Sequence, residues 1–212
     1  RTAAEFALRE LASPEGMLLG RFDADTSYVG LTLAEISARR GTDPATTLMA
    51  LIREALEARR AGGRGGESVI ATSMDEADVE RLIAWPFANI ASDGELAGRH
   101  PRGYGTFPRV LGRYVRERGV VALEDAVRKM TSLAAANVGL RDRGTVAPGM
   151  AADLARLDPA SILDRATPEA PHAVSEGVRT VWVNGQIVYD DGRTTGARPG
   201  HVLRRAGPPN NR

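Results

Sequence analysis

The spacing of apolar positions in the N-terminal part of the chain predicts three helices. Residues 3–11 form the first, and the second lies between Thr32, a suitable N-cap, and Gly41, a helix-ending residue. A third begins at Asp43-Pro44, because proline is accepted in the first helical turn. Its apolar residues recur at helical spacing, which predicts a core-facing stripe of Leu48, Leu51, Ile52, Ala55 and Leu56.

The next part of the chain alternates between strand and helix patterns. Residues 68–72 are predicted as a short strand and residues 75–84 as a helix. Residues 87–92 are mostly apolar and are followed by Asp93-Gly94, which predicts a buried parallel strand that delivers Asp93 at its C-terminal tip. The order strand, helix, strand favours an α/β fold.

The C-terminal part changes from helical to β patterns. A polar loop punctuated by glycine and proline is predicted over residues 94–108, followed by helices over 110–117 and 123–136. After Gly149, residues 152–159 and 178–189 have strand patterns, and the second of these turns at Asn184-Gly185 as a hairpin.

Composition narrows the classes of function. The chain has 42% hydrophobic residues, 26% charged residues and a formal net charge of +1, so nucleic acid is not expected as a partner. No apolar run is long enough for a membrane span, which predicts a cytoplasmic protein without a membrane partner. The absence of cysteine excludes disulfides and thiolate zinc ligands, and the chain has three histidines.

Asp93 and the loop that follows it carry the residues best suited to chemistry. The C-terminal tip of a parallel strand is where α/β barrels place catalytic carboxylates, although Asp-Gly is also a common turn dipeptide. His100 and Arg102 lie in a segment, residues 99–109, that also contains two further arginines and two aromatic residues. This composition suits recognition of an anionic group by a guanidinium, and a solvated basic loop is the alternative.

A series of short motifs gives a more specific indication. In chain order they are Ser92-Asp93-Gly94, His100-Pro101-Arg102, residues 105–112 (GTFPRVLG), residues 128–136 (RKMTSLAAA), residues 148–154 (PGMAADL) and residues 181–185 (VWVNG). Together they resemble the C-terminal part of the N-acyl-D-amino-acid deacylases, in the amidohydrolase superfamily. The likeness extends over nearly the whole chain from about residue 32.

The resemblance implies a zinc-dependent hydrolase that removes the acyl group from N-acyl-D-amino acids, its small-molecule substrates. Asp93 would be the general base that takes a proton from a zinc-bound water. Arg102 would bind the α-carboxylate of the substrate, and His100 would contact the substrate or order the loop. The family's metal-binding histidines have no match here and are expected upstream, while His172 and His201 are predicted to be structural or surface residues.

The resemblance also implies an architecture. Residues 1–145 would be the C-terminal part of a (β/α)8 barrel, residues 146–206 strands of a small β-sandwich, and residues 207–212 a disordered tail. Barrel and sandwich edges would then be unpaired unless a homo-oligomer or a missing N-terminal segment covers them. Two alternative functions stay open: a cyclic-amide hydrolase similar to dihydroorotases or hydantoinases, and a truncated, non-catalytic interaction domain.

Overall fold

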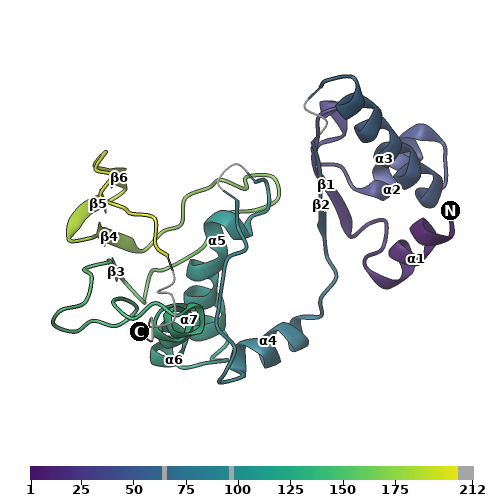
Figure 1. The fold of residues 1–212 in the computed structure, drawn as a ribbon. Coiled ribbons are helices and arrows are strands. Elements are labelled where there is room, and N and C mark those ends of the chain that lie inside the picture. Colours follow the sequence, from purple (N-terminus) through teal and green to yellow (C-terminus); the bar gives the residue numbers. More distant parts are fainter. Residues whose placement is uncertain (64–65, 96–97, 205–212) are drawn as a thin grey trace, which may run out of the picture. The chain divides into compact units, whose positions relative to one another are not determined.

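A computed structural model describes residues 1–63, 66–95 and 98–204 of the chain (Figure 1). The chain divides into two compact units. The first consists of residues 1–75, 95–100 and 167–171, and the second contains the other described residues. The predicted tail at 207–212 and the last two residues of the predicted sandwich lie outside the described residues.

The first unit packs helices against one side of a two-stranded antiparallel sheet (Figure 1). Its core contains buried side chains from one of the strands and from two of the helices, among them Phe22, Ile36 and Leu51. The elements are α1 (Thr2–Glu10), β1 (Met17–Phe22), the 3-10 turn η1 (Thr26–Tyr28), α2 (Leu33–Arg40), α3 (Pro44–Arg60) and β2 (Glu67–Ala71). The sequence patterns did not predict β1, which is the pairing partner of β2.

The predicted helix boundaries in this unit are confirmed by their capping bonds. Thr32 Oγ1 accepts from Glu35 N at 3.2 Å while Glu35 Oε2 accepts from Thr32 N at 2.8 Å, a complete capping box. Gly41 ends α2 with a left-handed φ of 63°, and Asp43 Oδ1 accepts from Thr46 N at 3.0 Å at the start of α3.

The predicted apolar stripe of α3 is partly wrong. Leu51 and Ala55 are buried, but Ile52 and Leu56 are exposed. The buried line runs through Thr47, Leu51 and Ala55 at a spacing of four residues. Each exposed residue is the next along the chain and is therefore rotated about 100° away from that line.

The second unit combines helices with a four-stranded antiparallel sheet in the order β3-β4-β5-β6 (Figure 1). The predicted hairpin is confirmed: Asn184 and Gly185 have φ values of 47° and 77°, as a tight turn between β4 and β5 requires. The elements are α4 (Glu76–Ala84), α5 (Arg102–Arg109), the π-helix η2 (Val110–Glu117), α6 (Leu123–Met130), α7 (Ser132–Val138), β3 (Leu154–Leu157), β4 (Val178–Val183), β5 (Gln186–Asp190) and β6 (Arg193–Thr194).

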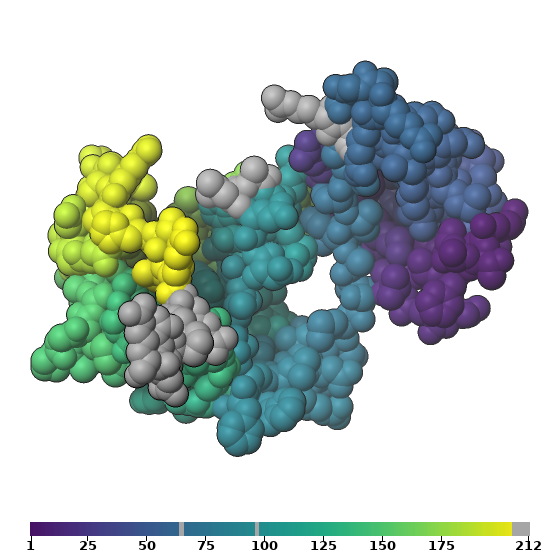
Figure 2. All heavy atoms as spheres, in the orientation of Figure 1, coloured from purple at the N-terminus to yellow at the C-terminus, as the bar shows by residue number. Residues whose placement is uncertain are grey.

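The core of the second unit is centred on η2 and α6. Val110, Leu111 and Tyr114 pack with Ala126 of α6 and with Ile162 from the loop that follows β3. In the space-filling view the green and yellow segments of this unit form one continuous surface (Figure 2). Both helices and strands are thus present, and the α/β content predicted from the sequence is confirmed.

Two predictions for the second unit are wrong. Residues 87–92 do not form a strand, and Phe87 is 77% exposed, because no strand lies beside this segment within the described residues to complete a ladder. Residues 102–108 were predicted as part of a loop but are helical, within α5. The predicted helix over 123–136 is present but interrupted at Thr131, which separates α6 from α7.

Packing explains why α5 forms from a sequence rich in glycine. A Cβ on Gly105 would lie 3.2 Å from Asp164 Cβ, and one on Gly112 would lie 2.7 Å from Ile162 O. The two glycines therefore let the α5–η2 helix approach the loop at 161–166, a tertiary gain that outweighs their low helix propensity. Pro108 lies inside the helix and cannot donate a backbone hydrogen bond, and the π-helix begins two residues later.

Candidate functional site

The Asp93 carboxylate is exposed on a turn with an uncommon backbone conformation. Its side chain is 83% exposed, and its backbone has a positive φ of 46°, a conformation that is uncommon for residues other than glycine. The next amide, Gly94 N, donates to Ser92 Oγ at 3.3 Å. The short turn around Asp93 therefore points the carboxylate into solvent although the predicted strand is absent.

Arg102 binds Asp93 through both its side chain and its backbone. Arg102 Nη2 lies 2.7 Å from Asp93 Oδ2, and Arg102 Nε donates to Asp93 O at 2.9 Å. Arg102 is the first residue of α5, so the helix fixes the guanidinium relative to the turn. Of the three residues predicted for the site, Asp93 and Arg102 are brought together, whereas His100 is half-buried in the bend before α5 and is grouped with the first unit.

Two glycines allow the Asp93 turn and the start of α5 to touch. A Cβ placed on Gly94 would lie 2.4 Å from the Cα of Gly103, closer than real Cβ contacts. Gly94 follows Asp93 directly and Gly103 follows Arg102 directly. The Asp93–Arg102 pair is therefore supported by backbone contact immediately beside it.

Long-range contacts hold α5 in place, and sequence reasoning missed the residues that make them. Arg109 Nε donates to Asp164 Oδ2 at 2.9 Å, and Ser175 Oγ donates to Tyr104 O at 3.0 Å. Arg116 Nη1 donates to Ile162 O at 2.6 Å. These partners are 55, 71 and 46 residues apart, so no local pattern could have revealed them.

Glu76, Arg113 and Tyr114 form a cluster beside the α5–η2 helix that stabilises the fold and is not a candidate for catalysis. Arg113 Nη2 lies 3.1 Å from Glu76 Oε1 at the start of α4. Burial raises the pKa of Tyr114 and the neighbouring Glu76 carboxylate raises it further, so the phenol stays protonated at neutral pH. The cluster joins α4 to η2 and does not include Asp93.

The residues that the structure describes do not form a metal site. The parts of the chain that the structure describes contain no group of three or more His, Asp or Glu side chains able to hold one, and the chain has no cysteine. His172 and His201 are exposed, in agreement with their prediction as surface residues, and the His172 ring packs 5.1 Å from that of Tyr104.

Among the described residues, none of the helices combines the length and the apolar character that a membrane crossing requires.

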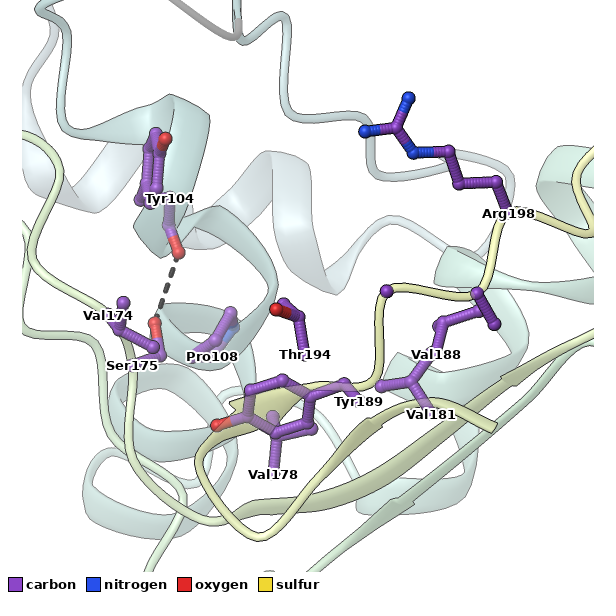
Figure 3. A pocket seen from close by; sticks show the side chains of 12 residues that line it. Tyr104, Pro108, Val174, Ser175, Val178, Val181, Val188, Tyr189, Thr194 and Arg198 are labelled. Atoms are coloured by element: carbon purple, nitrogen blue, oxygen red, sulfur yellow. Dashed lines mark hydrogen bonds between the residues drawn. The ribbon is translucent and has the colours of Figure 1, made fainter. Parts of the chain in front are cut away.

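A cavity of about 650 Å³ lies in the second unit (Figure 3). Its walls are mostly apolar and come from α5, the loop before β4, and the sheet, with Tyr189 and Val181 on one side and Tyr104 and Pro108 on the other. Neither Asp93 nor Arg102 lines it. The cavity lacks convergent charged groups and does not suggest catalysis.

Comparison with known proteins agrees with the resemblance seen in the motifs. The amidohydrolase family model matches residues 18–189, more than half of the chain. The chain belongs to the amidohydrolase family. It is 48% identical over 132 residues to N-acyl-D-aspartate deacylase of Alcaligenes xylosoxydans xylosoxydans, covering 61% of this chain and 26% of that protein.

Two further relatives of this amidohydrolase cover more of the chain. N-acyl-D-glutamate deacylase of Alcaligenes xylosoxydans xylosoxydans is 43% identical over 178 residues, 83% of this chain and 34% of that protein. The solved N-acyl-D-glutamate deacylase of Bordetella bronchiseptica, complexed with zinc and a phosphonate mimic of the tetrahedral intermediate, superposes with a TM-score of 0.80 at 36% identity. That match covers 95% of this chain and 39% of the other. The chain thus spans 26% to 39% of the length of these relatives.

Proposed function

We propose that the full-length protein hydrolyses the amide bond of N-acyl-D-amino acids, with Asp93 as the general base. The observation that carries the proposal is the exposed Asp93 carboxylate on a left-handed turn, paired with Arg102 at 2.7 Å. The named activities of the relatives, deacylases of N-acyl-D-aspartate and N-acyl-D-glutamate, support the substrate class. Asp93 would accept a proton from the attacking water and return it to the leaving nitrogen.

In this proposal Arg102 has two partners, the Asp93 side chain before substrate binds and the substrate carboxylate afterwards. Its guanidinium suits the α-carboxylate of the substrate because a planar fork of N–H donors matches two carboxylate oxygens. In the structure, the Nη2 group of that fork contacts the Asp93 side chain instead. We propose that the substrate carboxylate replaces Asp93 on Arg102, so that the base is freed only when substrate is bound. His100, in the bend before α5, orders the approach to this site or contacts the substrate.

The proposal includes the architecture and the metal expected for the family. In this proposal the C-terminal part of a (β/α)8 barrel, residues 1–145, contains the elements from α1 to α7, and a small β-sandwich, residues 146–206, contains β3–β6. Zinc, present in the Bordetella relative, is held in this proposal by residues of the full-length protein that have no match in this chain. Zinc would supply a Lewis acid for amide hydrolysis.

The test compares Asp93→Asn and Arg102→Gln in the full-length protein, with N-acetyl-D-aspartate and N-acetyl-D-glutamate as substrates. Asp93→Asn is expected to lower kcat by about 10²- to 10⁴-fold with little change in KM, since asparagine tolerates the same backbone but cannot accept the proton. Arg102→Gln is expected to raise KM by about 10- to 100-fold, because a charge-assisted bond to the substrate is lost. Bound zinc, measured by elemental analysis, should not change in either variant.

A matched control is Asp191→Asn, because Asp191 is also exposed and has a positive φ of 37°. It should leave kcat and KM unchanged. Asp93→Asn with wild-type kcat would remove Asp93 from the reaction. Turnover of dihydroorotate or hydantoin with none of N-acyl-D-amino acids would favour the cyclic-amide alternative, and no turnover of either class would favour a non-catalytic protein.

A further inference from the structure

One buried cation has no part in the site described so far. The chain contains 28 Lys and Arg residues, and Lys129 of α6 is the single lysine among them. Its side chain is 0% exposed, whereas arginines such as Arg81 and Arg165 make exposed ion pairs. A buried ammonium is costly unless oxygen atoms replace its hydration shell, so its surroundings carry information about its role.

The ammonium of Lys129 is surrounded by oxygen atoms from the segment that leads to Asp93. Lys129 Nζ donates to the backbone carbonyl of Trp85 and, at 3.5 Å, to that of Ala88. Asp125 Oδ2 on the same helix lies 3.8 Å away. An ammonium has three N–H donors, so the two carbonyl groups satisfy two of them, and the Asp125 carboxylate adds a charge within ion-pair distance.

The neighbouring residues of α6 and α7 hold the same segment. Arg128 Nη2 donates to Pro86 O at 2.7 Å, and the backbone carbonyl of Lys129 accepts from Ile90 N at 3.2 Å. On α7, Asn137 Nδ2 donates to Asn89 Oδ1 at 2.8 Å. Residues 85–90 are therefore fixed by helix side chains and one helix carbonyl, in place of the neighbouring strands that a sheet would provide.

The two adjacent cations suit different acceptors. The ammonium is a compact point charge that can enter the space between two carbonyl groups and a carboxylate, whereas a guanidinium is a broad planar fork. Trp85 also follows the last residue of α4, where backbone carbonyls lack helical partners and a cation is favourable. Lys129 thus stabilises the end of α4 and the start of the segment at once.

We propose that Arg128 and Lys129 are positioning residues for Asp93. They fix residues 85–90, and only Ala91 and Ser92 separate this fixed segment from the Asp93 turn. Arg102 fixes the turn from its other side. The inference rests on the proposed function, because a displaced Asp93 affects turnover only if Asp93 is the base. A displacement of about 1 Å at a reacting group can lower a rate by about 10²-fold.

The test uses Lys129→Met, which keeps the length of the side chain and removes its charge, in the full-length protein. We expect kcat for N-acetyl-D-glutamate to fall by about 10- to 100-fold while KM changes by less than about 3-fold. The loss should vanish in the Asp93→Asn background, since a positioning residue acts through the residue that it positions. Amide hydrogen exchange should become faster in the peptide that covers residues 85–93.

A second variant guards against failure of Lys129→Met to fold. Arg128→Ala removes the bond to Pro86 O from a side chain that is 40% exposed, and should lower kcat by about 3- to 10-fold with the same dependence on Asp93. Val127→Ala, at a neighbouring exposed position of α6, is the matched control and should change neither kcat nor exchange.

The outcomes separate the two proposals. Unchanged kcat and unchanged exchange in Arg128→Ala and in a folded Lys129→Met would overturn the positioning role while leaving Asp93 as base. A kcat loss that persists in full in the Asp93→Asn background would also overturn it. If Asp93→Asn itself leaves turnover intact, the proposed function fails, and the exchange measurement still reports whether the two cations hold residues 85–93.

Discussion

The α2–α3 region of the first unit and the support of α5 in the second unit are built by different kinds of contact. In the first region the decisive bonds join residues three apart, Thr32 with Glu35 and Asp43 with Thr46. In the second, the bonds that hold α5 join residues 55 and 71 apart. The residues proposed for chemistry belong to the second kind of region, where structure depends on the whole unit having folded.

The largest effect is expected where two distant backbones touch. Gly177 has a φ of 84°, and a Cβ on it would lie 2.5 Å from Ile162 Cα. Gly177→Ala should therefore destabilise the second unit by about 3 kcal/mol, from left-handed strain and overpacking together. Chemical denaturation followed by tryptophan fluorescence measures the unfolding of this unit, because Trp85 and Trp182 both lie in it.

Gly192→Ala separates the effect of left-handed backbone strain from the effect of overpacking. Gly192 has a φ of 89° but nothing within 4 Å of its Cβ position, so its replacement should cost only about 1 kcal/mol of backbone strain. Equal losses for the two variants would mean that the close contact with Ile162 contributes nothing. The comparison between local and long-range regions would then lose its sharpest example.

A smaller and more local effect is expected in the α2–α3 region. Thr32→Ala removes the acceptor for Glu35 N, and should destabilise the first unit by about 1 kcal/mol. Hydrogen exchange should accelerate mainly at the first turn of α2, since the lost bond satisfies a donor there. Thr26→Ala, at an exposed position in the same unit, should have no such effect. Acceleration that extended into the second unit would contradict the local character of this region.

The smallest effect concerns the charge at the start of α3. Hydrogen bonds from the Thr46 hydroxyl and then from Thr46 N lower the pKa of Asp43 below its ordinary value. The charged form therefore stabilises the folded state above the unfolded pKa of about 3.9, and this contribution is lost as the pH falls through the lower folded pKa. Asp43→Asn should have a lower Tm than the parent protein at pH 7 and an equal one near pH 2; a pH-independent difference would contradict this assignment.

The difference between short-range and long-range contacts also explains which parts of the fold could be predicted from the sequence. The ends of α2 and α3 and the turn at Asn184-Gly185 were predicted because caps and left-handed turns depend on a few adjacent residues. The strand expected at residues 87–92 was wrong, since an apolar run cannot reveal whether a neighbouring strand exists. The helix α5 was missed because Gly103, Gly105 and Pro108 signal a loop, and only their packing overrides that signal.

The candidate site divides in the same way. Asp93 was predicted from its place after an apolar run, Arg102 from the composition of residues 99–109, and both from the order of the motifs. The structure brings the two side chains together. Lys129 was not selected, because a lysine in a helical pattern is indistinguishable from a solvated one until its burial is known. Asp164 and Ser175, which hold α5, carry no local signal at all.

The contact between Gly94 and Gly103 has a consequence for how the protein can change. Because the two backbones meet directly, the two ends of the intervening stretch lie next to each other. Adding or removing residues between the two glycines would alter the closure entropy only slightly, by about 0.6 kcal/mol for a doubling of length. Positions 95–99, which precede the proposed site residues His100 and Arg102, are therefore a natural place for insertions. A side chain on Gly94, in contrast, would break the contact.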